Sequence, residues 1–342
     1  MLMNFNLMIF FSLMLISLCI GINSNSILFL WISLEINMMS FIPMILFMNN
    51  YFNDSSMKYF LIQSFSSSLM LFFSLFMFLM NWSIIMMIMI IFTIMMKIGG
   101  FPFFYWYLNI LINMSWFNCL ILMSTQKILP FFMFYNLIKL SNFYMIEMLM
   151  YFIYLLLMIN SISSIFLIYS TNSIKMLMGL SSINHLSWMM LNIILSFKIW
   201  LMYFLIYSLT LMNLIINLNK FKINFLNELF TIFNNNFLLK IIMFLLMMIL
   251  MGLPPFIMFF LKTFSLMIFS KFNLQFYMYL LINLSIIMFF FYMKLMMPSM
   301  LWFNSNLINN MNYYFYYKNF NFMMFLFMII NFTIFIYWII NY

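Results

Sequence analysis

Long apolar runs alternate with short polar breaks along almost the whole chain. The runs approach or exceed the roughly 20 residues that an α-helix needs to cross a bilayer, and Asn, Ser and Lys gather in the breaks. The pattern predicts about eleven transmembrane helices, over residues 4–22, 25–48, 57–80, 83–108, 116–138, 144–168, 173–194, 197–219, 238–270, 274–298 and 321–340. Because lipid offers the backbone no hydrogen bonds, this pattern indicates an all-α polytopic membrane protein.

The composition excludes a soluble enzyme. Of the 342 residues, 68% are hydrophobic and only 5% are charged, whereas a soluble domain carries charge on about 25% of its residues. The longest polar interludes, 220–236 and 299–320, are too short to form a separate soluble domain. We therefore predict a single transmembrane domain over residues 1–342.

The choice of apolar residues points to a biased genome. Ala, Val and Arg are absent, while there are 46 Met and 50 Phe residues. Ala and Val are good membrane residues, so membrane physics does not explain their absence. The residues that remain have A/T-rich codons, which indicates an organellar genome, and we interpret the Met and aromatic stripes as packing or lipid-facing positions instead of cofactor sites.

The chain lacks the usual motifs for redox groups and nucleotides. Its two cysteines, Cys19 and Cys119, form no CxxC pair and are too few for a four-thiolate iron–sulfur site. There is no GxGxxG or phosphate-binding loop. The 13 lysines are scattered, so nucleic acid is not an expected partner, and without an A-x-A-like site before the first span we expect no cleavable signal.

Lysines near the predicted helix ends orient the chain in the membrane. With eleven spans, one set falls on the side of the N terminus and a smaller set on the opposite side. The first set is Lys58, Lys175, Lys220, Lys222, Lys240, Lys294 and Lys318, and the second is Lys139, Lys198 and Lys271. Since positive charge is retained inside, the N terminus is predicted to lie inside and the C terminus outside.

Four charged residues lie within predicted spans instead of at their ends: Glu35, Lys97, Lys127 and Lys262. A charge at the centre of a membrane helix costs about 2.5–3.5 kcal/mol on insertion scales. One alternative is that these residues form structural ion pairs, but a single carboxylate cannot pair with three lysines. Lysine gives up its proton readily when it is buried, so the set favours proton transfer.

Two of these lysines lie beside predicted helix breaks. Pro removes a backbone donor and clashes with the preceding turn, so both spans should be discontinuous. The residues concerned are Gly99, Gly100 and Pro102 after Lys97, and Gly252, Pro254 and Pro255 before Lys262. The end of such a half-helix carries partial negative charge, which would favour a cation.

The position of the two breaks predicts an internal repeat. They fall in the fourth and ninth predicted spans, five helices apart, and an odd offset reverses the direction of insertion. We therefore predict two inverted five-helix repeats, over 1–138 (spans 1–5) and 144–298 (spans 6–10), followed by a C-terminal helix over 321–340. Paired interruptions of this kind mark transport sites in membrane proteins.

His185 is the single histidine, and two interpretations remain open for it. It could be a hydrogen-bonded packing residue, or it could relay protons between the lysines because its side chain titrates near neutral pH. Asp54, Glu147, Glu228 and the lysines at helix ends are interpreted as solvated or interfacial charges.

Several motifs, taken together, resemble a known family. They occur in order as SNSILFLWISLEINMMSFIP (24–43), SSMKYFLIQSFSSS (55–68), LILMSTQKILP (120–130), LSSINHLSW (180–188) and GLPPFIMFFLK (252–262). With the length and span count, they resemble the antiporter-like membrane subunits of NADH:ubiquinone oxidoreductase, respiratory complex I, and among these the subunit 2 family. Departures from the family pattern include Phe104 in place of a His, Leu108 in place of a Pro and Lys175-Met176 in place of an Arg-Lys pair.

The resemblance implies roles for the intramembrane residues. Glu35 matches the glutamate that modulates the lysine of the first broken helix, here Lys97. Lys127 matches a central lysine, although Thr125 replaces the usual Trp of that motif. His185 matches a histidine on the central hydrophilic axis, and Lys262 matches a lysine on the exit side.

The resemblance also implies the function and the setting. The chain would be a core subunit that translocates protons across the mitochondrial inner membrane, with its N terminus on the matrix side, coupled to electron transfer from NADH to ubiquinone. NADH, FMN, iron–sulfur clusters and ubiquinone would bind to other subunits, and this chain would bind no metal or cofactor. Its partners would be other membrane-arm subunits and inner-membrane lipids such as cardiolipin.

Two alternatives remain open from the sequence. The first is a stand-alone or Mrp-type cation/proton antiporter built on the same fold. The second is a structural membrane scaffold in which the buried charges have no transport role.

Overall fold

The elements are all α-helices in the part of the chain that the structure describes. The computed structural model describes residues 2–24, 26–48, 54–79, 83–140, 143–226, 228, 237–270 and 275–301. The helices are α1 (Leu2–Asn23), α2 (Ile27–Met48), α3 (Ser55–Leu79), α4 (Ser83–Ile98), α5 (Phe104–Asn113), α6 (Trp116–Met123), α7 (Thr125–Leu140), α8 (Phe143–Ile168), α9 (Ile174–Leu195), α10 (Phe197–Lys220), α12 (Phe237–Met251), α13 (Ile257–Ser270) and α14 (Gln275–Leu301).

The prediction of an all-helical membrane protein is confirmed. Within the described residues, seven segments are long and apolar enough to cross a membrane: Phe5–Asn23, Ile27–Met48, Ser55–Met77, Trp116–Lys139, Met148–Ile168, Phe197–Lys220 and Gln275–Met293. Shorter apolar helices occur at Ile84–Ile98, Lys240–Met251 and Ile257–Ser270. The predicted helix over 321–340 lies outside the described residues, as do Lys271 and Lys318.

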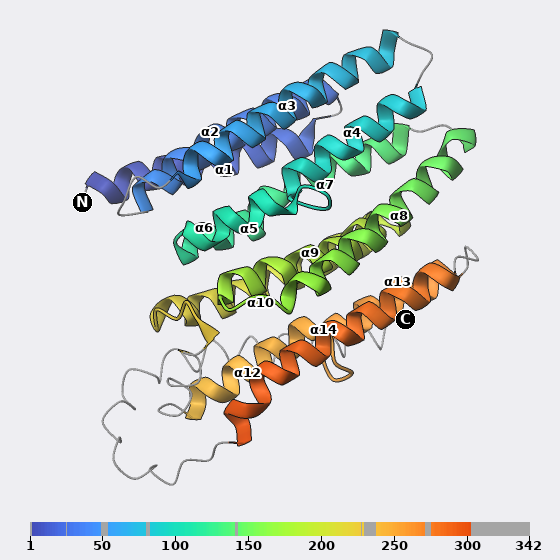
Figure 1. Ribbon diagram of the computed structural model, residues 1–342. Helices are drawn as coiled ribbons and strands as arrows, with labels where there is room; N and C mark the ends of the chain where they lie inside the picture. Colours follow the sequence, from blue (N-terminus) through green and yellow to red (C-terminus); the bar gives the residue numbers. More distant parts are fainter. Residues whose placement is uncertain are drawn as a thin grey trace. The chain divides into compact units, whose positions relative to one another are not determined.

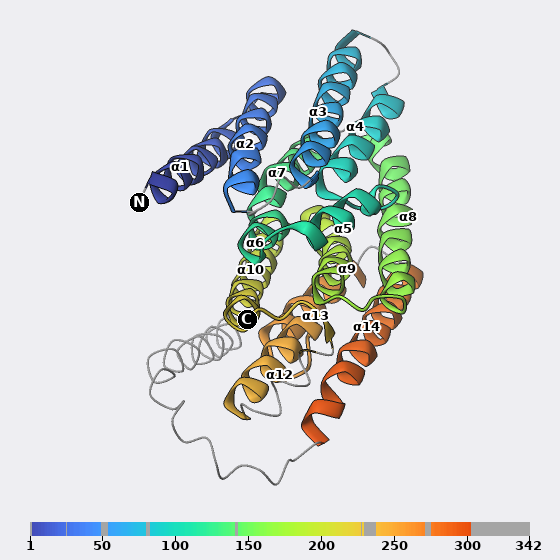
Figure 2. The same cartoon turned by 60° about the vertical axis from the view of Figure 1, so that its left-hand side comes forward.

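The chain divides into two units, Met1–Trp200 and Leu201–Tyr342. In the first unit, α1 packs along α2, α3 along α4 and α8 along α9 (Figures 1 and 2). In the second unit, α12 packs against both α13 and α14. This division follows packing, and it does not test the predicted repeats, which are defined by the order and direction of the helices.

Both helices that flank the predicted breaks end at a glycine in the left-handed conformation. Gly99 follows α4 with φ of 78°, and Gly252 follows α12 with φ of 79°. The amide of Gly99 donates to Met95 O at 3.0 Å, and the amide of Gly252 donates to Met248 O at 3.2 Å. Glycine ends helices in this way because it has no Cβ to oppose positive φ.

The structure also contains an interruption that the sequence did not predict. The span expected over 116–138 is divided at Ser124, whose φ and ψ are −116° and −83°. The hydroxyl of Ser124 donates to Leu120 O at 2.6 Å and that of Thr125 donates to Ile121 O at 3.1 Å, four residues back. Hydroxyls bonded in this way compete with the backbone ladder. Pro130, within α7, adds a position without an N–H.

Candidate functional site

The structure places four of the predicted site residues in the first unit. Glu35 lies on α2, Lys97 in the last turn of α4, Lys127 in the first turn of α7 and His185 on α9. The fifth, Lys262, lies on α13 in the second unit. Two of the five, Lys97 and Lys127, come together in one cavity.

Lys97 and Lys127 share a small cavity, with about 20 Å³ of space for the centre of a water molecule. Both lysines are buried, with exposed fractions of 7% and 2%. The cavity is lined with polar groups from several helices as well as with apolar side chains, and none of its described lining residues is acidic. The polar and charged lining residues are Asn37, Tyr59, Gln63, Lys97, Trp106, Tyr107, Gln126 and Lys127. Such a lining can hold water next to two cationic groups.

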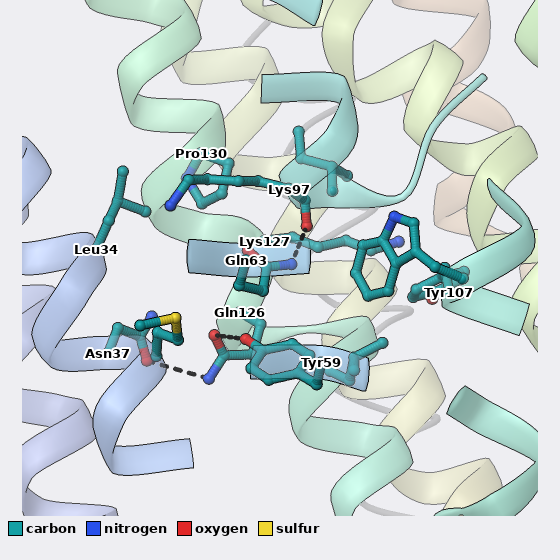
Figure 3. Close-up of a pocket in the computed structure, with 13 residues that line it drawn as sticks. Leu34, Asn37, Tyr59, Gln63, Lys97, Tyr107, Gln126, Lys127 and Pro130 are labelled. Carbon is teal, nitrogen blue, oxygen red and sulfur yellow. Dashed lines mark hydrogen bonds between the residues drawn. The ribbon is translucent and has the colours of Figure 1, made fainter. Parts of the chain in front are cut away.

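The two lysine side chains extend in opposite directions. In the view of Figure 3, Lys97 runs toward the side of Leu34, and Lys127 runs toward Tyr107. The Lys127 ammonium lies 5.1 Å from the centroid of the Tyr107 ring. This arrangement separates two like charges that line the same cavity, which reduces their repulsion.

Amide and hydroxyl groups connect the helices around the cavity (Figure 3). Gln126 Nε2 donates to Asn37 Oδ1 at 3.1 Å, and Tyr59 Oη donates to Gln126 Oε1 at 3.2 Å. Gln63 Nε2 donates to the carbonyl oxygen of Lys97 at 3.0 Å. The last bond satisfies a carbonyl at the end of α4, where the helix supplies no amide partner.

Lys127 makes its hydrogen bond to a residue of α9. Its Nζ atom donates to Ser182 Oγ at 3.2 Å, and the same oxygen lies 2.6 Å from Tyr107 Oη. Ser182 and Tyr107 are both 1% exposed. The lysine, the serine and the tyrosine thus form a buried polar contact between α7, α9 and α5.

Glu35 is half-buried on α2, one residue after Leu34, which lines the cavity. It is close enough for its negative charge to act on the Lys97 ammonium. This agrees with the direction that the Lys97 side chain takes in Figure 3. The geometry therefore suits Glu35 to an electrostatic influence on Lys97.

His185 is 4% exposed in the middle of α9. It follows Ser182 by three residues, so the two side chains lie on the same face of the helix. Asn160 of α8 joins this part of α9 to the break after α4: its Nδ2 donates to Ile183 O at 3.0 Å, and its Oδ1 accepts from the Phe101 amide at 2.9 Å. The helix that carries His185 is thus tied to the segment that follows Lys97.

In the second unit, Lys262 reaches back across the other break. Its Nζ atom donates to Met251 O at 3.0 Å, and its side chain is 8% exposed. Met251 is the last residue of α12, whose end carries the partial negative charge of the helix dipole. The expected attraction between a half-helix end and a lysine is therefore present at Lys262.

Some residues of this arrangement could not be predicted from the sequence. Ser182 lies in the motif at 180–188 and Tyr107 lies in the predicted span 83–108, but hydroxyl residues are so common in this chain that nothing distinguishes these two. The sequence predicts Lys175 to be a solvated or interfacial lysine. It is half-buried, and its Nζ atom donates to Met114 O at 2.6 Å and to Ile112 O at 3.3 Å, at the end of α5.

Metal-ligating residues do not gather in the described part of the chain. No group of three or more His, Cys, Asp or Glu side chains there is placed to hold a metal ion. Cys19 is exposed and Cys119 is buried, and both are free thiols. The chemistry of the described site is thus that of ammonium, carboxylate, hydroxyl and amide groups.

Comparison with known proteins gives consistent matches. The family described as "NADH:quinone oxidoreductase/Mrp antiporter, TM" matches residues 24–290. NADH-ubiquinone oxidoreductase chain 2 of Anopheles gambiae is 35% identical over 299 residues, which cover 84% of each chain.

Two solved structures share the fold. A chain of respiratory complex I from Thermus thermophilus with bound aureothin has a TM-score of 0.77 and 16% identity, covering 86% of this chain and 70% of that one. A chain of the Mrp complex from Dietzia sp. has a TM-score of 0.66 and 11% identity, covering 83% of this chain and 58% of that one.

Proposed function

This chain belongs to the NADH:quinone oxidoreductase/Mrp antiporter transmembrane family, among the relatives of NADH-ubiquinone oxidoreductase chain 2, and on that premise we propose that its buried lysines carry protons across the membrane. It acts as a membrane subunit of the proton-translocating NADH:ubiquinone oxidoreductase, respiratory complex I. Electron transfer takes place elsewhere in the complex, and this subunit contributes proton translocation.

The observation that carries the proposal is the cavity shared by Lys97 and Lys127. Two ammonium groups in one buried space are costly, and a structural role would call for acidic partners. Glu35 acts on Lys97 from outside the lining, so one carboxylate serves two lysines, and the described lining residues supply amide and hydroxyl groups instead of acids. Lysines in such a place are suited to bind and release a proton in turn.

The proposed sequence of steps begins at Glu35. When its charge acts on Lys97, the ammonium form of that lysine is favoured; when the charge is neutralised or moved, Lys97 releases its proton. The proton passes through cavity water to the neutral amine of Lys127, which leaves Lys97 as an amine and Lys127 as an ammonium. From Lys127 it continues by way of His185 to Lys262 and leaves on the outer side.

We also propose the full architecture of eleven spans with two inverted five-helix repeats, over 1–138 and 144–298, and a C-terminal helix over 321–340. The two left-handed glycines, Gly99 and Gly252, support this repeat because they end the corresponding half-helices in the same way. With eleven spans, the distribution of lysines places the N terminus on the matrix side.

The proposed setting is the mitochondrial inner membrane. This follows from the relatives named NADH-ubiquinone oxidoreductase chain 2, which support membership of the same complex. Other membrane-arm subunits and lipids such as cardiolipin are the proposed partners, and no nucleic acid is involved. NADH, FMN, iron–sulfur clusters and ubiquinone are proposed to bind to other subunits.

An Mrp-type antiporter is the second candidate, because the chain shares its fold with a member of the Mrp complex. That likeness supports the fold alone, at 11% identity. The relative from Anopheles gambiae, at 35% identity over most of both chains, favours the oxidoreductase.

The test of the proposed function is Lys127→Met in the assembled complex, with proton uptake and NADH oxidation measured in sealed vesicles. We expect fewer protons pumped per electron, because methionine fills a similar space but carries no proton. The matched control is Lys139→Met, at the exposed end of the same helix. An unchanged ratio in Lys127→Met would support the structural scaffold instead.

A further inference from the structure

The hydroxyl of Ser182 has all of its hydrogen-bonding capacity in use. A serine hydroxyl has one hydrogen and two lone pairs. Ser182 Oγ donates its hydrogen to Gly179 O at 2.7 Å. It accepts from Lys127 Nζ at 3.2 Å, so the contact of 2.6 Å with Tyr107 Oη is one in which the tyrosine donates. The contacts with Gly179 and Tyr107 therefore fix the orientation of the Ser182 hydroxyl, so that one lone pair of its oxygen points to the Lys127 ammonium.

Tyr107 reaches Ser182 because α5 approaches α9 closely at Gly179. A Cβ at Gly179 would lie 2.7 Å from Leu111 Cδ1 and 2.9 Å from Leu108 Cδ2, closer than packed side chains allow. Glycine at this position thus lets two α5 leucines lie against α9. The contact places the tyrosine of the same helix one turn of α9 away, at Ser182.

We propose that Ser182 and Tyr107 are positioning residues for Lys127, which hold its ammonium group at α9 and away from Lys97. The inference rests on the proposed proton-transfer function, since holding the charged group there serves that transfer. In this position the proton-carrying side chain lies beside the helix of His185. Without the hydrogen bond to Ser182, the Lys127 side chain is free to turn back into the cavity that it shares with Lys97.

The test uses Ser182→Ala in the assembled complex, with NADH-driven proton uptake and NADH oxidation measured in sealed vesicles. We expect fewer protons pumped per NADH, because the loss of a hydrogen bond to a charged group lowers the fraction of Lys127 held at α9 about tenfold. Ser182→Thr keeps the hydroxyl and should restore pumping. Ser181→Ala is the matched control, because Ser181 is equally buried and bonds to Met178 O of its own helix.

A second variant, Tyr107→Phe, removes one oxygen atom and keeps the ring. Like Ser182→Ala, it should lower the number of protons pumped per NADH. The double variant Tyr107→Phe/Ser182→Ala should pump as many protons per NADH as Ser182→Ala alone, since both substitutions act on one contact. The control is Tyr105→Phe, at an exposed position of the same helix.

The outcomes separate this inference from the proposed function. If Ser182→Ala and Tyr107→Phe pump normally while Lys127→Met does not, positioning by the two hydroxyls is wrong and the proposed function stands. If Ser182→Thr fails to restore pumping, the loss in Ser182→Ala comes from packing and the inference is overturned. If Lys127→Met also pumps normally, both fail.

Discussion

The ammonium groups of Lys127, Lys175 and Lys262 differ in the oxygens that accept their hydrogen bonds. Lys175 and Lys262 donate to backbone carbonyls at the ends of α5 and α12, whereas Lys127 donates to a serine hydroxyl. The single hydrogen of Ser182 is donated to Gly179 O, so the serine oxygen, like the two carbonyls, acts as an acceptor toward its lysine. At the level of single residues, Lys127 therefore depends on a side chain, while Lys175 and Lys262 depend on the backbone.

Lys262→Arg separates a structural role of Lys262 from a transport role. Arginine keeps the positive charge and can still donate to Met251 O, but it does not release its proton. We expect the complex to assemble and the protons pumped per electron to fall, as measured in sealed vesicles. Retention of full pumping by Lys262→Arg would mean that Lys262 serves to hold the end of α12 and carries no proton.

The charged residues could be predicted from the sequence because a lysine in an apolar run is conspicuous. Lys97 and Lys127 were identified in this way, and the structure places both at one cavity. The contact of Tyr107 with Ser182 could not be predicted. It depends on the close approach of α5 and α9 at Gly179, a tertiary feature that leaves no local pattern.

At the scale of elements, helix interruptions gather around the buried lysines. α4 ends one residue after Lys97, α7 begins two residues before Lys127, and α12 ends at the carbonyl that Lys262 contacts. The breaks with Gly and Pro were predictable because these residues act on the backbone directly. The interruption at Ser124 was not, since it involves hydroxyl bonds to carbonyls four residues back and Ser is abundant in this chain.

Gly252→Ala tests the break after α12. An L-residue in the left-handed region costs about 1–2 kcal/mol, and a Cβ there would lie 3.4 Å from Lys262 Nζ. We expect less assembled complex after heating, measured by native electrophoresis. Gly252→Asn is the internal comparison because Asn tolerates positive φ, so its loss should be smaller. Equal losses in the two variants would show that crowding, not backbone strain, decides the effect.

At the scale of the whole molecule, the composition identifies a membrane protein, and the family match identifies the kind of complex to which it belongs. So few charges can belong only to a chain that lies within lipid or within other subunits. The number of spans beyond residue 301 rests on the sequence pattern, because that part of the chain lies outside the described residues.

Membership of the oxidoreductase predicts how the intact chain migrates. After mild solubilisation and native electrophoresis, mass spectrometry should find it in the large band that stains for NADH dehydrogenase activity. The fold is shared with a member of the Mrp complex, so the fold cannot decide this point. Migration alone or with small partners would favour the antiporter, and cation flux would then be the activity to assay.

The opposed directions of Lys97 and Lys127 have an electrical consequence. With one ammonium toward each side of a single cavity, the proposed transfer of a proton from Lys97 to Lys127 reverses the local electric field across the space between them. The helices need not move for this reversal to occur. Neighbouring dipoles and charges then experience a field of opposite sign. A change in protonation can therefore act on nearby titratable groups electrostatically, without a movement of the backbone.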